Sequence, residues 1–203
     1  SFPAGGVAVV IGATGAEKFD QWSQEIRIAS PVGQTFEYLA GAYYQKNTLD
    51  IKNDIWFQLS EISPPRIAFR PDAIDAIRVN NFDQDSETWS AFFEGTWNIT
   101  DHFRSIVGLR YTDETKDLDK SLSLKEYDNT PIDLNTDPLL ALIWATGVDV
   151  VPYEESRSRA EDDWSPSIRF EYDSSEEMMV YASWTRGFKG GGFDNNHSNG
   201  SNI

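Results

Sequence analysis

The chain lacks cysteine entirely and has only two histidines, His102 and His197, among its 203 residues. The absence of cysteine excludes disulfide scaffolds, thiol nucleophiles and cysteine-bound zinc, which makes a transition-metal enzyme improbable. Basic residues are also scarce, with 17 lysines and arginines against 33 acidic residues and a formal charge of −16. Nucleic acid is therefore not expected as a partner, because a basic surface is needed to displace counterions from phosphates.

Long apolar runs are missing as well. No segment approaches the roughly 18 to 20 apolar residues that a membrane-spanning helix requires. A transmembrane β-strand needs only about ten alternating residues, so this absence leaves a membrane β-barrel open. The first residues, SFPAGGVAVVIGATG, contain an apolar patch with no basic residues before it, and we do not expect them to be a signal peptide.

The glycines do not form a convincing nucleotide-binding motif. Gly12 and Gly15 have the spacing of a dinucleotide-binding turn, but Lys18 replaces the third small residue, and the next residues alternate like a strand instead of a helix. We expect a loop or strand end over residues 1–18, and no cofactor. No catalytic set is recognised, and the run from Lys189 to Gly192 lacks the order of a phosphate loop.

What the sequence does contain is alternation with a period of two residues. Between residues 90 and 99 apolar side chains at odd positions alternate with mostly polar ones at even positions, and residues 103–111 alternate in the same way. The residues between these runs, Asn98 to His102, favour a turn. The pattern predicts a β-hairpin. Further alternating runs complete the set of expected strands, near 19–30, 35–52, 86–99, 103–116, 164–173 and 178–188.

Four of these stretches resemble a known family. The string TWNITDHFRSIVGLRYTDETKD is similar to the barrel hairpins of TonB-dependent outer-membrane receptors, in which an aromatic strand and a turn ending in Thr-Asp precede a strand closing on Gly-Leu-Arg-Tyr-Thr. Three other stretches fit the same family in the expected order: WSQEIRIASP from Trp22, WSPSIRFEYD from Trp164 and VYASWTRGFKGGGF from Val180. The resemblance covers most of residues 19–194.

The resemblance implies an all-β fold, with about six strands in three hairpins belonging to a larger antiparallel, up-and-down transmembrane β-barrel. It implies a receptor in the outer membrane of a Gram-negative bacterium that takes up a scarce nutrient, such as an iron chelate, cobalamin or a carbohydrate. The implied partners are outer-membrane lipid, the plug and the other barrel strands, TonB, and a small nutrient ligand. The plug and TonB box are not found here, so we expect a segment of a receptor, with a loop or truncated end over residues 195–203.

Charge predicts which face of the strands would line the barrel lumen. Lysine or arginine on the lipid face costs about 2–4 kcal/mol at the bilayer midplane. We therefore expect Glu94, Arg110, Arg169 and Glu171 to point into the lumen. The alternate set is expected to face lipid or to form aromatic girdles: Phe93, Trp97, Leu109, Tyr111, Phe170 and Tyr172. The tryptophans near strand ends are further girdle candidates, since indole favours the membrane interface: Trp22, Trp89, Trp97, Trp164 and Trp184.

The segments between hairpins, residues 53–84 and 116–160, exceed an ordinary connection and are expected to be long extracellular loops. Within the second segment, Asp137 and Pro138 suit the start of a short helix whose apolar side chains pack in the loop cluster. Acidic pairs such as Asp113-Glu114 have the oxygen ligands that calcium prefers, but no segment has the spacing of an EF-hand. No metal site is predicted.

A soluble β-sandwich that binds carbohydrate through its aromatic side chains is the alternative, because 7 Trp, 8 Tyr and 12 Phe suit either fold. The sandwich predicts two stacked sheets around a dry centre and a monomer that is soluble without detergent. The receptor interpretation predicts one sheet with Glu94 and Arg110 on its inner wall.

Overall fold

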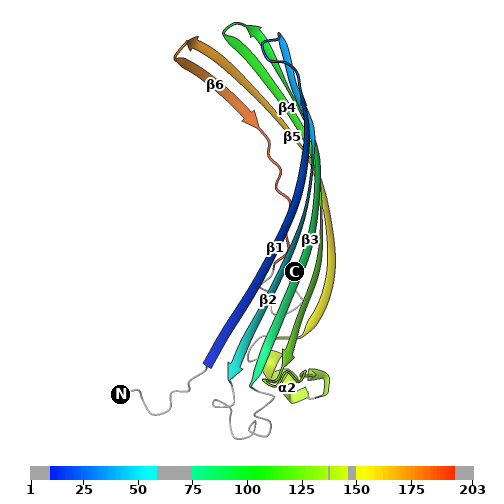
Figure 1. Ribbon diagram of the computed structural model, residues 1–203. Helices are drawn as coiled ribbons and strands as arrows, with labels where there is room; N and C mark the ends of the chain where they lie inside the picture. Colours follow the sequence, from blue (N-terminus) through cyan, green and yellow to red (C-terminus); the bar gives the residue numbers. More distant parts are fainter. Residues whose placement is uncertain (1–9, 59–74, 137, 146–149, 195–203) are drawn as a thin grey trace, which may run out of the picture.

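The computed structural model describes residues 10–58, 75–136, 138–145 and 150–194, which form one antiparallel sheet with the strand order β1-β2-β3-β4-β5-β6. The strands are β1 (Val10–Ala29), β2 (Phe36–Gln58), β3 (Ala76–Thr100), β4 (Phe103–Lys125), β5 (Tyr153–Ser175) and β6 (Met178–Thr185). Figure 1 shows a long bowed wall that does not close on itself. The expected all-β, antiparallel arrangement of about six strands is confirmed. Because the described residues form a single sheet, a β-sandwich is excluded for them.

The hairpin turns are short and lie at one end of the wall (Figure 1). In the first turn Gly33 adopts a φ of 82°, a conformation that costs residues with a side chain more than glycine. The side-chain amide of Asn98 donates to the carbonyl oxygen of Gln34 at 2.6 Å, so the first turn is tied to the second hairpin. In the second turn the backbone N–H of His102 donates to Oγ1 of Thr100 at 3.3 Å.

At the other end, the strands extend well beyond the segments expected from the sequence. The interpretation of residues 53–84 and 116–160 as loops is wrong at their ends, because β2 continues to Gln58, β3 begins at Ala76, β4 continues to Lys125 and β5 begins at Tyr153. The physical reason is that backbone pairing continues where charged residues, such as Asp117, Asp119 and Lys120, surround the few apolar side chains that still alternate, Leu118, Leu122 and Leu124 of β4. The middle parts of these connections, residues 59–74 and 146–149, lie outside the described residues.

The first strand also begins earlier than expected. Gly12 and Gly15 lie inside β1, opposite Trp56 and Asn53 of β2, so neither belongs to a phosphate-binding turn. Of the loop or strand end expected over residues 1–18, the strand is found from Val10 onward and the loop is not. Residues 1–9 and the expected loop or truncated end at 195–203 lie outside the described residues.

A small hydrophobic core covers one face of the sheet at the end far from the short turns. It joins Phe57, Ala76, Leu122 and Leu124 of the strands to Leu140, Trp144 and Val150 of the β4–β5 connection. We call this set the cap cluster. The connection contains the 3-10 helix η2 (Leu134–Thr136) and the helix α2 (Pro138–Ile143), in agreement with the expected short helix, although Asp137 lies outside the described residues. The rings of Phe57 and Trp144 meet edge to face at 5.5 Å.

The β4–β5 connection begins with a tight polar turn. Asn129 adopts a φ of 72°, and its backbone N–H donates to the carbonyl oxygen of Glu126 at 3.0 Å. The backbone N–H of Thr130 donates to the carboxylate of Asp128 at 2.9 Å, and this bond lowers the pKa of Asp128. Among the described residues, neither helix is long and apolar enough to cross a membrane.

The cap cluster allows a matched test on one helix. Leu140 is 6% exposed whereas Leu142 is 58% exposed. Leu140→Ala should loosen the connection by about 2–5 kcal/mol because it leaves a cavity, and Leu142→Ala should change stability by less than about 0.5 kcal/mol. The measurement is hydrogen exchange of the Val150 amide, which donates to the carbonyl of Trp144 at 3.0 Å. Equal exchange in the two variants would show that the cap cluster does not hold the connection.

Candidate functional site: the two faces of the sheet

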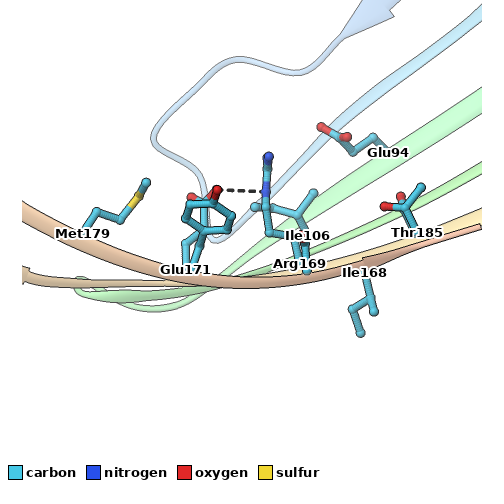
Figure 2. Close-up of a pocket in the computed structure, with 10 residues that line it drawn as sticks. Glu94, Ile106, Ile168, Arg169, Glu171, Met179 and Thr185 are labelled. Carbon is cyan, nitrogen blue, oxygen red and sulfur yellow. Dashed lines mark ion pairs between the residues drawn. The ribbon is translucent and has the colours of Figure 1, made fainter.

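The strand register places every side chain on one of two faces. Directly opposite residues of paired strands share a face, and neighbours along a strand alternate. Glu94 lies opposite Gly108, Arg110 opposite Phe92, Ile106 opposite Arg169 and Arg104 opposite Glu171. Residues 94, 110, 169 and 171 therefore share one face, which we call the ion-pair face. Figure 2 shows Glu94, Arg169 and Glu171 on one side of the ribbon and Ile168 on the other.

The other face carries the apolar set, and we call it the aromatic face. Phe93 lies opposite Leu109, and Tyr111 lies opposite Trp164. Trp97 lies opposite Ser105, which in turn lies opposite Phe170, and Tyr172 lies opposite Phe103. All six residues expected to face lipid or form a girdle are thus on the face opposite the four charges. The rings of Phe103 and Phe170 also stack at 6.2 Å across β4 and β5.

A row of aromatic rings crosses five strands of the aromatic face. Ring centroids lie 5.6 Å apart for Trp22 and Tyr44, 5.4 Å apart for Trp89 and Tyr111, and 4.9 Å apart for Tyr111 and Trp164. Tyr44 and Trp89 are direct cross-strand partners, so the series is continuous from β1 to β5. We call these five residues the aromatic row. Sequence reasoning named its three tryptophans and Tyr111 as lipid-facing or girdle residues and placed Tyr44 in phase with Phe36 and Tyr38, but only the register shows that Tyr44 lies between Trp22 and Trp89.

Two of the tryptophans expected to form girdles, Trp97 and Trp184, lie outside the aromatic row. Trp184 of β6 is opposite Ile168, and Trp97 is level with Phe170 through Ser105. Both positions lie between the aromatic row and the short turns. Along β5, Ile168 and Phe170 are four and six residues beyond Trp164. Trp97 and Trp184 therefore belong to the apolar surface between the aromatic row and the short turns.

The aromatic row runs at an angle to the backbone hydrogen bonds. Starting from Trp22, successive hydrogen-bonded partners are Lys46, Glu87, Thr115 and Ala160, whereas the row ends at Trp164, four residues nearer the short turns. Four residues at ~3.3 Å each, over four strand spacings of ~4.8 Å, correspond to an inclination of about 35°. Strands of transmembrane barrels tilt by about 35–45°. The inclination of the row therefore matches the ordinary tilt of barrel strands in size, as expected for a row that runs around a barrel at one height.

Ion pairs link the strands on the ion-pair face near the short turns. The carboxylate of Glu171, which is 9% exposed, pairs with Arg104 and, at 2.9 Å, with Arg169. Arg104 also contacts the carboxylate of Asp173 at 3.2 Å. The guanidinium of Arg110 donates to Oγ of Ser90 at 2.6 Å. Three of the four charges expected to share a face thus make cross-strand or along-strand polar contacts.

A hollow of about 420 Å³ opens beside this network between β3 and β6. Glu94, Ile106, Arg169, Glu171, Met179 and Tyr181 are among its lining residues (Figure 2). Because the hollow holds two carboxylates and a guanidinium beside its apolar side chains, it is suited to contact a hydrated polar surface. Among the described residues, no group of three or more histidine or acidic side chains has a metal-binding arrangement.

Beyond the aromatic row the ion-pair face carries charges to which sequence reasoning assigned no face. Lys116 pairs with Glu114 at 2.9 Å, and Arg159 pairs with Glu161. The acidic runs considered as calcium ligands are divided by the alternation: Glu114 and Glu161 lie on the ion-pair face, while Asp113 and Asp162 lie opposite each other on the aromatic face. No apolar alternation marks residues 113–117 and 158–163, so the faces of these charges could be assigned only from the register.

An open, inclined antiparallel wall with one ion-paired face and one aromatic face is the wall of a large β-barrel. Comparison with known families agrees: residues 8–203 match the family described as "TonB dependent receptor-like, beta-barrel", and the chain belongs to this family. Comparison with curated proteins gives no match.

A solved structure shows the same fold. The crystal structure of the ferric yersiniabactin uptake receptor FyuA from Yersinia pestis aligns with a TM-score of 0.57 and 15% identity, covering 85% of this chain and 21% of that chain. At this identity the similarity shows the fold alone. The chain spans about a fifth of the length of that receptor.

The shared acceptor Glu171 allows a test of the ion-pair face. Glu171→Ala removes the carboxylate that Arg104 and Arg169 both contact. Because both guanidinium groups are partly solvated, the expected loss is about 1 kcal/mol, at the low end for an unsatisfied polar group. Glu177→Ala, in the exposed turn between β5 and β6, is the control and should leave stability unchanged. The measurement is the urea midpoint of the full-length protein in bilayers, and equal midpoints for the two variants would contradict the network.

Proposed function

We propose that this chain is part of a TonB-dependent outer-membrane receptor that takes up a scarce nutrient with energy relayed by TonB, a transport role without catalysis. Family membership supports the receptor class. The observation that carries the proposal for this chain is the separation of its two faces. One face carries charges paired with one another, and the other carries large apolar side chains exposed to the surroundings: Trp22, Ile26, Ile28, Phe93, Trp97, Val107, Leu109, Phe170 and Trp184.

The aromatic face is proposed to contact outer-membrane lipid. On β3 the apolar surface runs from Trp89 in the aromatic row to Ile99 beside the second turn. These ten residue steps correspond to ~33 Å along the strand, or about 25 Å along the membrane normal at a tilt of ~40°. Transmembrane barrels have an apolar band about 25 Å tall, flanked by aromatic girdles. The height of the apolar surface therefore fits one bilayer crossing.

The aromatic face becomes acidic immediately past the row. Lys46 and Glu87 pair there at 3.1 Å, and Asp50, Asp83 and Asp119 lie opposite one another on β2, β3 and β4. Charges on this face are incompatible with hydrocarbon at the depth of the bilayer centre. We therefore place the row at the outer boundary of the membrane, the short turns on the periplasmic side and the long connections outside the cell.

The ion-pair face is proposed to line the lumen, with Glu94, Arg110, Arg169 and Glu171 toward the plug. The outer edges of β1 and β6 pair with no strand among the described residues. In hydrocarbon every backbone N–H and C=O needs a hydrogen-bond partner, so both edges require further barrel strands. The remaining strands, the plug, TonB and a small nutrient are therefore the proposed partners. Because FyuA is an uptake receptor for ferric yersiniabactin, an iron chelate is the first nutrient to test.

Two adjacent residues of β6 test the assignment of the faces. Ala182 lies on the aromatic face opposite Phe170, and Ser183 lies on the ion-pair face opposite Arg169. Both are exposed. In the full-length receptor, Ala182→Arg should cost about 2–4 kcal/mol because it places a cation in hydrocarbon. Ser183→Arg should cost less than about 1 kcal/mol, because it places a cation opposite Arg169 but in the hollow that also holds the carboxylates of Glu94 and Glu171.

The measurement is the amount of folded receptor in outer membranes, determined from heat-modifiable migration on gels. The proposal predicts strongly reduced folded receptor for Ala182→Arg and nearly unchanged folded receptor for Ser183→Arg. Equal amounts, or a greater loss for Ser183→Arg, would contradict the assignment of the aromatic face to lipid.

A further inference from the structure

After β6 the chain leaves the sheet edge and crosses the ion-pair face. The last ladder bond runs from the N–H of Arg186 to the carbonyl oxygen of Pro166 at 3.0 Å. Residues 186–194, which we call the strap, then run back along the wall (Figure 1). The guanidinium of Arg186 pairs with Asp163 at 2.7 Å, and farther along Lys120 donates to the carbonyl oxygen of Asp194 at 3.0 Å. The strap therefore passes over both β5 and β4.

Gly191 is bound at both of its backbone polar groups. Its N–H donates to Oε2 of Glu161 on β5 at 2.6 Å, and its carbonyl oxygen accepts from Nζ of Lys116 on β4 at 2.6 Å. Both wall groups are charged, and hydrogen bonds to charged groups are stronger than bonds between neutral groups. The wall thus recognises one amino-acid backbone unit by its donor and its acceptor.

The register explains why the wall offers these groups. Lys116 lies directly opposite Arg159, and Glu114 lies directly opposite Glu161. Like charges opposite each other on paired strands are destabilising, so the ion pairs form along each strand instead, Lys116 with Glu114 and Arg159 with Glu161. A ligand that places an acceptor beside Lys116 and Arg159, and a donor beside Glu114 and Glu161, relieves both repulsions. We call these four residues the clasp.

Glycine allows the strap to approach the clasp closely at two positions. A Cβ atom at Gly190 would collide with the carboxylate of Glu114, and a Cβ at Gly191 would collide with the guanidinium of Arg159. Both contacts are with the ends of flexible side chains, so a larger residue there would displace Glu114 or Arg159 from its ion pair. At Gly187 and Gly192 a Cβ would meet nothing within 4 Å.

The strap is held by polar contacts instead of a buried core. None of its residues is buried, and Phe188, Gly190, Gly191 and Phe193 are half-buried. Segments with few buried apolar contacts open at low free-energy cost. Release of the strap would break hydrogen bonds and ion pairs that water can replace, without disturbing the sheet.

We propose that the clasp is a binding site for a glycine peptide backbone, that residues 190 and 191 of this chain occupy it, and that the strap is released as a unit to open the clasp to the lumen. The lumenal location rests on the proposed function, because it assigns the ion-pair face to the barrel interior. The binding of the strap to the wall does not depend on that assignment.

The test uses the full-length receptor in outer membranes, with Leu118→Cys as its reporter cysteine; the 203 residues contain no other. Leu118 is 1% exposed and lies on the ion-pair face between Lys116 and Lys120, which both bind the strap, so a cysteine there should become accessible when the strap is released. The measured quantity is the rate of labelling by a water-soluble maleimide. Lys116→Met should raise this rate on the order of tenfold, the effect of losing one charged hydrogen bond. Lys46→Met is the matched control, because it removes a lysine that pairs with Glu87 on the aromatic face.

Two further pairs of variants separate the clasp from general damage. Gly191→Ala should raise the labelling rate, whereas Gly187→Ala should not. Glu161→Gln keeps an oxygen that accepts from Gly191, so it should raise the rate less than Glu161→Ala does. Equal labelling of Lys116→Met and Lys46→Met, in variants that retain heat-modifiable migration, would overturn the clasp and leave the proposed function standing. Loss of heat-modifiable migration in the parent receptor would instead contradict the proposed function.

Discussion

The structure depends on an unbroken ladder of backbone hydrogen bonds across six strands. From β1 to β5 the register shifts only beside the second turn, between Asn98 and Thr100, and from β5 to β6 only beside the third, between Asp173 and Ser175. Because side chains alternate along each strand, this register decides which residues share a face, and a slip of one residue would exchange the faces. The ion pairs of Glu171 and the aromatic row both exist because the register holds.

The same strands are proposed to serve two environments. Between the short turns and the aromatic row, the strands separate apolar from charged residues, as a wall between lipid and water requires. Past the row, both faces carry charge, and Asp83 and Glu114 illustrate the two sides. There the sheet is stabilised by its ladder, by the cap cluster and by contacts with the strap. Much of the chain's acidic excess lies on the aromatic face of this outer part, which we propose to lie outside the membrane.

The sequence predicted the fold best where the environment is most asymmetric. Between Trp89 and Ile99 the alternation is clear, and the hairpin at residues 98–102 and the faces of Glu94 and Arg110 follow from it. Between Ala76 and Asp85 both faces carry polar residues, such as Asn80 and Asn81, so periodicity could not reveal that β3 continues. For residues 1–18 the sequence left a loop or a strand end open, and Gly12 and Gly15 lie inside β1, opposite Trp56 and Asn53 of β2. The strap could not be predicted, because its contacts join residues 116, 161 and 191, which are distant in sequence.

The central claim is that one face of β3 contacts hydrocarbon between Trp89 and Ile99 while both faces contact water before Trp89. A spin-label scan of residues 81–99 in the full-length receptor in bilayers tests it most directly, using oxygen as the apolar collision partner and a nickel chelate as the polar one. The account predicts oxygen access at residues 91, 93, 95 and 97, nickel access at residues 90, 94 and 96, and nickel access on both faces from residue 81 to 87. Oxygen access at position 94 with nickel access at 93, or no alternation between 90 and 98, would contradict it.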